Sequence, residues 1–294
     1  MRIYFRTENK NKLNLFFYSH RFFYLCRKIL PKNNFYMKKL NLLLLFAVAF
    51  SCTAMAWDNR GHSTIAYIAE RHLTPRAKAN IESYIGGRSI VYYAAWMDFN
   101  RSTPPMDVTR DWHVDYWTNE HRTDANGNPQ PPCSVSQIKR IVSDMSDFRS
   151  LSDSLVSINI KYLVHLVGDM HCPVHIDFPT SRPMKVTMEK KPVKVHAMWD
   201  AYVLNSKHNG TSPMQLAEEF DILSAEQIAK VQSGHPDQWH LETVEISKKV
   251  ISMLPENKKV TYDNYLNEAI KYAEDRITVA GYRLAAILNS IFDK

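Results

Sequence analysis

The sequence predicts an all-α fold: a single compact multi-helix domain with one small extended or hairpin segment. Between residues 57 and 294, apolar side chains recur mostly at the three- and four-residue spacing of amphipathic helices. Start and stop signals separate these runs, since Thr74-Pro75 opens one helix and Gly86-Gly87 closes it. Apolar and polar residues alternate within residues 177–195, which predicts a short hairpin or an extended lid there.

The predicted helices follow one another along the chain. A first helix is expected over residues 63–73, and irregular structure over residues 100–133, where Pro, Asn and charged residues are frequent. The most apolar helix should cover residues 154–171, lie buried at the centre and end at Pro173. The other predicted helices cover residues 134–151, 196–204, 236–253 and 264–292, and one more starts at the capping box Ser224-Ala-Glu-Gln227.

The segment before Trp57 is typical of a secretory signal peptide. Residues 37–56 contain a basic start, Met37-Lys38-Lys39, an apolar run and the cleavage signature Ala54-Met55-Ala56. The apolar run is shorter than the roughly 20 residues that a membrane-spanning helix needs. We therefore expect cleavage after Ala56 and a periplasmic or secreted protein that has no transmembrane segment.

Two alternatives to this processing remain. Residues 1–36 show no clear periodicity and are interpreted as an extension from a misassigned start, with Met37 as the initiator; the alternative is a real cytoplasmic extension. A lipid anchor on Cys52 is the less favoured alternative to cleavage after Ala56, because Ala49-Phe50-Ser51 lacks the usual branched residue. The expected mature domain is residues 57–294.

The charge of the whole chain does not describe this mature domain. The first 56 residues hold ten of the 37 Lys and Arg but one of the 30 Asp and Glu, so residues 57–294 carry 27 basic and 29 acidic side chains, a net charge of −2. Net charge therefore does not indicate a nucleic-acid-binding surface. If the protein acts on phosphates, metal ions must supply positive charge at the site. The two cysteines of this domain, Cys133 and Cys172, could pair or remain free thiols.

Two His-Asp pairs at helical spacing indicate a metal centre. His165 and Asp169 are four residues apart in the apolar helix, and His196 and Asp200 repeat this spacing. A buried carboxylate needs a partner, which could be a structural hydrogen bond or a metal ion. Imidazole nitrogen and carboxylate oxygen suit zinc. His171 points away from this helix face, so we expect it to pack or to support a ligand. Further candidate ligands are His62, which lies close to the expected new N-terminus at Trp57, and Asp98, His113 and His175.

The order of these residues resembles a known family, the zinc-dependent nucleases of the S-one/P-one type, whose superfamily also holds bacterial zinc phospholipase C. The matching motifs are Trp57-Asp-Asn-Arg-Gly61-His62, Ala95-Trp96-Met97-Asp98 with Arg101, His165-Leu-Val-Gly-Asp169-Met-His171-Cys-Pro-Val-His175, His196-Ala-Met-Trp199-Asp200 and Ala280-Gly-Tyr-Arg-Leu-Ala285. They span nearly all of residues 57–294.

The resemblance implies a trinuclear zinc cleft. By analogy, Asp98, His113, His165 and Asp169 hold one ion; Asp169, His62 and the amino and carbonyl groups of Trp57 hold a second; and His175, His196 and Asp200 hold the third. The catalytic assignments that follow are Asp98, Arg101 and Asp169. Two close zinc ions would generate hydroxide from a bridging water, and the third ion and Arg101 would offset phosphate charge during in-line attack.

The implied function is a phosphodiesterase acting on single-stranded RNA and DNA, an endonuclease and a candidate 3′-nucleotidase, monomeric and without a stable protein partner. The alternatives are a phospholipase-C-like enzyme acting on lipid head groups and a non-enzymatic zinc-binding helical protein. A membrane-acting enzyme should expose apolar residues around residues 184–192.

The chain also departs from the family pattern. Asp58 replaces the Gly after the first Trp, Val114 stands where an aromatic residue often follows the loop His, and Asp115 lies two rather than three residues after His113. The family's Gly-Gly-Asn loop is replaced by residues 184–195. We therefore expect a family-like metal site within a different substrate pocket.

Overall fold

Helices dominate the computed structural model, which describes residues 57–116, 132–177 and 184–294. The α-helices are α3 (Asn59–Arg71), α4 (Pro75–Tyr84), α5 (Trp96–Asn100), α6 (Ser134–Asp144), α7 (Asp153–His171), α8 (Val195–Met198), α9 (Leu204–His208), α10 (Pro213–Phe220), α11 (Ala225–Gln232), α12 (Pro236–Ser252) and α13 (Asn267–Phe292). Shorter helical turns are η1 (Ile90–Tyr93), η2 (Met106–His113), η3 (Met145–Ser150), η4 (Pro173–His175), η5 (Trp199–Val203) and η6 (Tyr262–Leu266). The predicted all-α class is confirmed, and the predictions for residues 1–56 lie outside the described residues.

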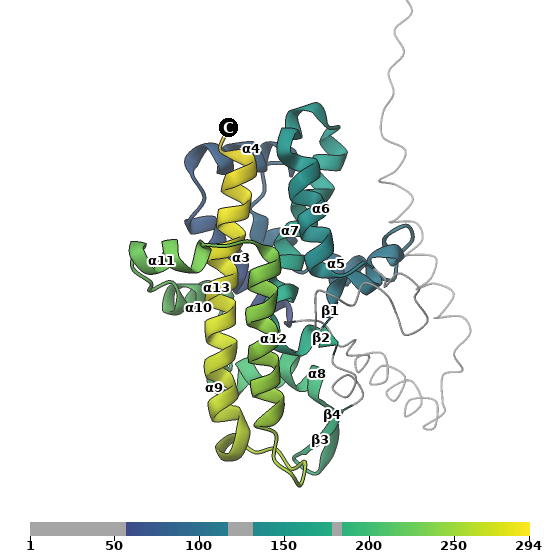
Figure 1. Cartoon of the computed structure of the whole chain (residues 1–294), viewed down its shortest axis with the longest axis vertical. Helices are drawn as coiled ribbons and strands as arrows, with labels where there is room; N and C mark the ends of the chain where they lie inside the picture. Colours follow the sequence, from purple (N-terminus) through teal and green to yellow (C-terminus); the bar gives the residue numbers. More distant parts are fainter. Residues whose placement is uncertain (1–56, 117–131, 178–183) are drawn as a thin grey trace, which may run out of the picture. The chain divides into compact units, whose positions relative to one another are not determined.

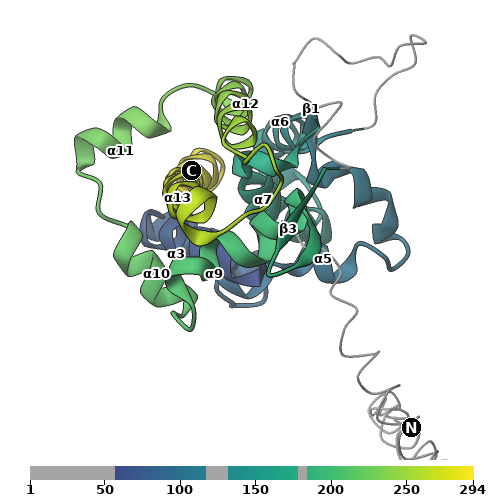
Figure 2. The same cartoon turned by 90° about the horizontal axis from the view of Figure 1, so that it is seen from below.

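The core forms where α13 packs against α3 and α7. Figure 2 shows α13 between α12, α7 and α3, with α10 and α11 on one side and α5 and β3 on the other. A Cβ atom on Gly281 of α13 would lie 2.6 Å from the Ile68 side chain of α3, so this glycine allows the two helices to approach closely. Ile65, Ile68, Ile277 and Leu284 are buried, and each such side chain contributes about 1.5–3 kcal/mol on burial.

Helix α7 is the buried central helix that the sequence predicts. It begins at Asp153, where the Ser152 hydroxyl accepts the Leu155 N–H, and Pro173 follows its end. Almost every side chain from Asn159 to His171 is buried, the polar His165 and Asp169 included. The metal-site candidates on this helix therefore lie inside the protein.

Two small sheets complete the described structure. Strands β3 (Lys185–Met188) and β4 (Lys191–Lys194) form an antiparallel hairpin, which confirms the predicted hairpin segment (Figure 1). Glu189 and Lys190 at its turn both have positive φ, the geometry of a type I′ turn. Strands β1 (Asp115–Tyr116) and β2 (Ile176–Asp177) pair in parallel, so the chain just after η2 lies beside the chain just after η4.

Some elements differ from the predictions. Of the helix predicted over residues 134–151, α6 covers the part up to Asp144 and the 3-10 turn η3 the part up to Ser150, with non-helical dihedral angles at Asp147. The 3-10 helix η2 lies in the region that was predicted to be irregular, because so short a helix leaves no recognisable periodicity in the sequence. Among the described residues, no helix combines the length and the apolar character needed to cross a bilayer.

Candidate metal centre

Seven separate segments bring the predicted ligands together. Helix α3 carries His62, α5 carries Asp98, η2 ends at His113, and α7 carries His165 and Asp169 on one face. The η4 turn ends at His175, while His196 on α8 and Asp200 on η5 are one turn apart. The β1–β2 pairing explains why His113 and His175 lie close, although 62 residues separate them in the sequence.

Asp169 is the hub of this cluster. Its Oδ2 lies 2.9 Å from His113 Nδ1 and 3.2 Å from His165 Nε2. Its Oδ1 lies 3.4 Å from His62 Nε2 and 3.3 Å from His175 Nδ1. The carboxylate is fully buried, and each of its two oxygens faces a different pair of imidazoles. That arrangement is the one expected of a carboxylate shared between two cations.

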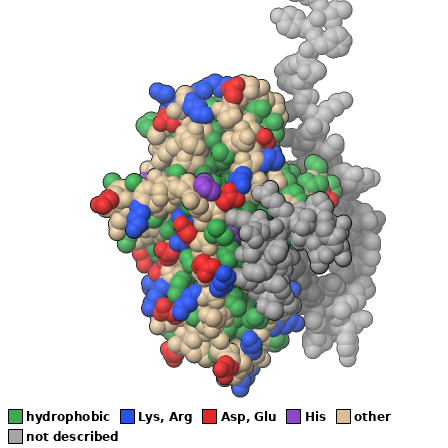
Figure 3. Space-filling model, viewed as in Figure 1, with side chains coloured by type: hydrophobic (Ala, Val, Ile, Leu, Met, Phe, Trp, Pro, Cys, Tyr) green, Lys and Arg blue, Asp and Glu red, His purple; other side chains and the backbone are tan. Residues whose placement is uncertain are grey.

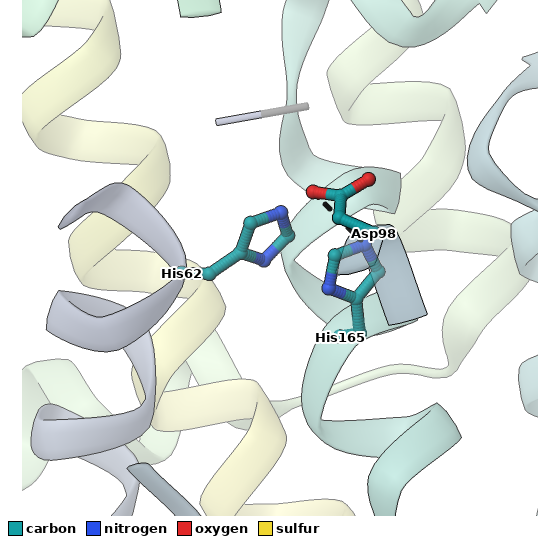
Figure 4. Close-up of side chains that lie close together, drawn as sticks. All are labelled: His62, Asp98 and His165. Carbon is teal, nitrogen blue, oxygen red and sulfur yellow. Dashed lines mark ion pairs between the residues drawn. The ribbon is translucent and has the colours of Figure 1, made fainter. Parts of the chain in front are cut away.

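His62, Asp98 and His165 form one potential ligand group. Their donor atoms lie within 4.8 Å of one another, and Figure 4 shows both imidazoles next to the Asp98 carboxylate. The His62 and His165 rings stack with centroids 4.0 Å apart. His165 Nδ1–H donates to the Ala94 carbonyl at 2.8 Å, which leaves Nε2 directed toward Asp98 and Asp169. His113, His165 and Asp169 form a second such group.

A third group surrounds Asp200. His196 Nε2 lies 3.2 Å from Asp200 Oδ2, His175 Nε2 lies 4.0 Å from Oδ1, and the two imidazoles stack. The Cys172 thiol also has its sulfur within 4.8 Å of donor atoms of His175 and Asp200. Cys172 was not among the predicted ligands, and its position three residues before His175 is the signal that could have indicated it.

Many polar atoms of this cluster have no hydrogen-bond partner. Ten of the fifteen buried side-chain atoms that lack a hydrogen bond in the described part of the chain belong to His62, Asp98, His113, Asp169, His175 and Asp200. Leaving so many buried acceptors and donors unpaired would be costly, unless another group binds them. This concentration favours a cation site over a purely structural hydrogen-bond network, which was the alternative for Asp169.

The electrostatics of the cluster also fit bound cations. Burial, and then the nearby Asp169 and Asp98 carboxylates, raise the pKa of Asp200 well above its usual value. Burial alone would lower the pKa of His165, but Asp169 and Asp98 outweigh it and raise this pKa to about 9. Burial would raise the pKa of Asp169, yet the neighbouring His165 and His175 hold it well below its usual range. Without metal, the cluster must therefore take up protons to limit repulsion among its carboxylates.

Trp57 lies between two ligand-bearing segments. Its indole N–H donates to the Gly168 carbonyl at 3.1 Å, one residue before Asp169, and its side chain is 1% exposed. The next backbone N–H, of Asp58, donates to the Asp200 carbonyl at 3.2 Å. The Asp58 carboxylate accepts the N–H groups of Arg60 and Gly61, so the residue that replaces the family's Gly caps α3.

Gly168 sets the distance between α3 and α7. A Cβ atom there would lie 2.8 Å from His62 Nδ1 and 3.2 Å from the Ile65 side chain, so only glycine fits without displacement. The absence of a side chain on one helix thus makes room for a predicted ligand on the other.

The remaining predicted residues take distinct places. Arg101 Nη1 lies 3.5 Å from Asp98 Oδ1, and its side chain is 23% exposed, so it reaches the cluster from the solvent side. His171 contacts the Val167 carbonyl and Arg283 instead of the cluster, as predicted. Cys133 and Cys172 are both buried free thiols, which decides between the two states left open by the sequence.

Comparison with known proteins identifies the family. Residues 57–293 match the S1/P1 Nuclease family. The chain belongs to this family. It is 24% identical to Nuclease S1 of Aspergillus oryzae over 83% of this chain and 94% of that protein, and 25% identical to Nuclease P1 of Penicillium citrinum over 80% and 97%. Endonuclease 4 of Arabidopsis thaliana is 22% identical over 81% and 90%.

The match to nucleases confirms the resemblance and supports a hydrolase of phosphodiester bonds. It disfavours the non-enzymatic alternative. Among solved structures, the alpha-toxin of an avian Clostridium perfringens strain gives a TM-score of 0.45 at 13% identity, over 82% of this chain and 65% of that chain. This likeness is too low to support a functional conclusion.

Proposed function

We propose that residues 57–294 form a zinc-dependent endonuclease that hydrolyses single-stranded RNA and DNA. The observation that carries the proposal is the cluster of buried imidazoles and carboxylates around Asp169, most of which have side-chain atoms without a hydrogen bond, in a chain of the S1/P1 Nuclease family. Nuclease S1, Nuclease P1 and Endonuclease 4 are named for cleavage of nucleic acid.

The proposed cofactor is three zinc ions. The donors are nitrogen and oxygen atoms, which suit zinc, and the carboxylates need positive charge to remain ionised in this buried place. Asp98, His113, His165 and Asp169 would hold one ion, and Asp169, His62 and the Trp57 backbone a second. His175, His196 and Asp200 would hold the third. Cys172 lies close enough to the last group to contact the same ion.

The protein's own residues supply orientation and charge. Zinc, when bound, lowers the pKa of a coordinated water toward neutrality and offsets charge on phosphoryl oxygens. The Ala94 carbonyl orients the His165 imidazole, and the shared Asp169 carboxylate fixes the spacing of the two donor groups that it contacts. Arg101 offers a guanidinium at the solvent edge of the cluster, where it can pair with a substrate phosphate.

The surface of the β3–β4 hairpin favours nucleic acid over the phospholipid alternative. The exposed side chains on the hairpin are Lys185, Glu189, Lys190, Lys191, Pro192 and Lys194, whereas Met188 and Val193 are half-buried and Val186 is buried. A membrane-acting enzyme should instead expose apolar side chains there. The described hairpin therefore lacks the feature expected of the lipid-directed alternative.

We also propose that export and processing create the active form. Cleavage after Ala56 would make Trp57 the first residue, and its free amino group could then act as a zinc ligand. The family match beginning at residue 57 and the burial of Trp57 between α7 and η5 support this proposal.

The test is a parallel assay of protein that begins at Trp57. Single-stranded DNA and RNA, 3′-mononucleotides and phosphatidylcholine are offered with zinc, after chelation, and after zinc is restored. We expect zinc-dependent cleavage of the single strands without release of a lipid head group. Hydrolysis of phosphatidylcholine alone, or undiminished cleavage after complete removal of metal, would contradict the proposal.

A further inference from the structure

A group of exposed lysines lies next to the metal centre. We name it the lysine patch and define it by the side chains of the β3–β4 hairpin and the segment beside it, Lys185, Lys190, Lys191, Lys194, Lys258 and Lys259. Blue side chains appear at the lower end of the face shown in Figure 3, where Figure 1 places this hairpin. All six are exposed.

The backbone holds the patch together as one surface. Thr187 N–H donates to the Lys258 carbonyl at 2.7 Å, and Val260 N–H donates to the Thr187 carbonyl at 2.9 Å. Thr187 also forms a parallel bridge with Lys259. The segment 258–260 therefore lies against the outer edge of β3, and its two lysines lie beside those of the hairpin.

The charges of the patch repel one another. Lys185 and Lys194 are direct partners across the antiparallel hairpin, and like charges at such positions destabilise the pair. Within the described ranges, no carboxylate forms an ion pair with any of the six lysines. The hairpin thus keeps an unfavourable concentration of positive charge, which an anionic partner would relieve.

Charge is also unevenly distributed over the domain. Residues 184–194 and 256–260 hold six Lys and two Glu, a net charge of +4. Since residues 57–294 together carry −2, the other residues carry −6. A polyanion would therefore be attracted to this surface more strongly than the overall charge of the domain suggests.

Protection of a sheet edge does not account for the whole patch. Lysines often prevent edge-to-edge aggregation of exposed strands. That role fits β4, whose outer edge has no strand beside it among the described residues, but the edge of β3 is already covered by residues 258–260. Lys185 and Lys259 need another explanation.

The patch leads directly to a predicted metal ligand. Val195 N–H donates to the Met184 carbonyl at 3.0 Å and closes the base of the hairpin, and His196 is the next residue. A four-residue strand extends about 13 Å, so the lysines continue outward from the metal centre over a length that spans more than one nucleotide.

We propose that the lysine patch binds the phosphate backbone of a single strand beyond the nucleotides at the metal centre. This inference rests on the proposed nuclease function and adds an extended binding surface to it. The patch attracts the strand through its charge without reading its bases, so it favours long substrates over short ones.

The experiment compares two double variants of the mature holoenzyme. Lys185→Gln with Lys194→Gln removes the opposed pair, and the control, Lys230→Gln with Lys271→Gln, removes two exposed charges on α11 and α13. For each protein, kcat/KM is measured against salt concentration on a long single strand and on a dinucleotide.

We expect the hairpin variant to lose about five- to tenfold of kcat/KM on the long strand at low salt, mainly through KM. The logarithmic salt slope should decrease by about 0.7 for each lost phosphate contact. The dinucleotide rate, zinc content and the control variant should remain unchanged.

The outcomes distinguish this inference from the proposed function. If the unmodified enzyme cleaves neither substrate, the nuclease proposal fails. If it cleaves both and the hairpin variant retains full rate and salt slope on the long strand, the patch proposal alone is overturned. The same holds if the variant loses only binding to anionic phospholipid vesicles, because the patch would then serve a membrane.

Discussion

Asp169→Asn should separate metal binding from folding more clearly than any other single change. The substitution preserves the side-chain shape, but removes the charge and replaces one acceptor oxygen by an amide N–H group, which cannot ligate a cation. Four imidazoles lie within 3.4 Å of this carboxylate. Its loss therefore disturbs every donor group that contacts it.

The expected magnitude follows from the place of Asp169 in the cluster. Loss of a group that only supports a metal ligand costs about 10–100-fold in affinity or activity. Asp169 is proposed to contact two ions directly, so its loss should cost more than about 100-fold in kcat/KM, or more than ~2.7 kcal/mol. The zinc content should fall by at least about one ion per chain.

Asp115→Asn is a matched control, because Asp115 is also fully buried and the chemical change is the same. Its carboxylate accepts the Ser134 hydroxyl and the Val135 N–H and so fixes the start of α6. We expect a loss of about 1.5–3 kcal/mol in the free energy of unfolding, with zinc retained and kcat/KM reduced less than about tenfold. Elemental analysis, thermal unfolding and single-strand cleavage are measured for both. Equal zinc contents and equal activities would refute the shared-ligand role of Asp169.

Four further predictions concern the same site. Purified mature protein should contain close to three zinc ions, and chelation should lower its melting temperature strongly, because metal binding contributes to folding free energy; one ion or fewer by elemental analysis would contradict this. A form with Gly-Ser before Trp57 should lose one zinc more readily and most of its turnover at unchanged helical content by circular dichroism, because an amide nitrogen is a poor ligand. Zinc binding to metal-free protein at pH 7 should release at least about one proton, since His165 has a pKa of about 9 and that of Asp200 is raised, as calorimetry in buffers of different ionisation enthalpy would measure. Burial raises the pKa of Cys133 to about 12 and that of Cys172 well above its usual value, so thiol reagents should react with two thiols rapidly only after unfolding.

The helices could be predicted because their signals are local. Pro75 at the start of α4, the capping box before α11 and the apolar run of α7 each act within a few residues. The short hairpin or extended lid was predicted over residues 177–195 for the same reason, since an alternating pattern depends only on neighbouring residues. Where a local signal is weak, as at η2 or at Asp147 within η3, the prediction was wrong.

The membership of the candidate site could be predicted, but its geometry could not. The His165–Asp169 and His196–Asp200 spacings place each pair on one helical face. No local pattern shows that β1 pairs with β2 and thereby brings His113 to the cluster. The proximity of Cys172 to Asp200 depends likewise on how separate segments pack. Long-range contacts of this kind depend on how all the elements of the core pack together.

The missing side chain of Gly168 makes part of the site invisible to any search for reactive groups. Gly168 offers no donor atom except its backbone, yet its surface holds the His62 ring and its carbonyl receives the Trp57 indole. In a saturation mutagenesis experiment, substitutions of Gly168 should reduce activity as substitutions of the ligands do, although glycine has no side chain that could bind a metal ion. An engineer who grafts the histidines and aspartates of this centre onto another helical bundle must therefore also keep a glycine at the position equivalent to Gly168.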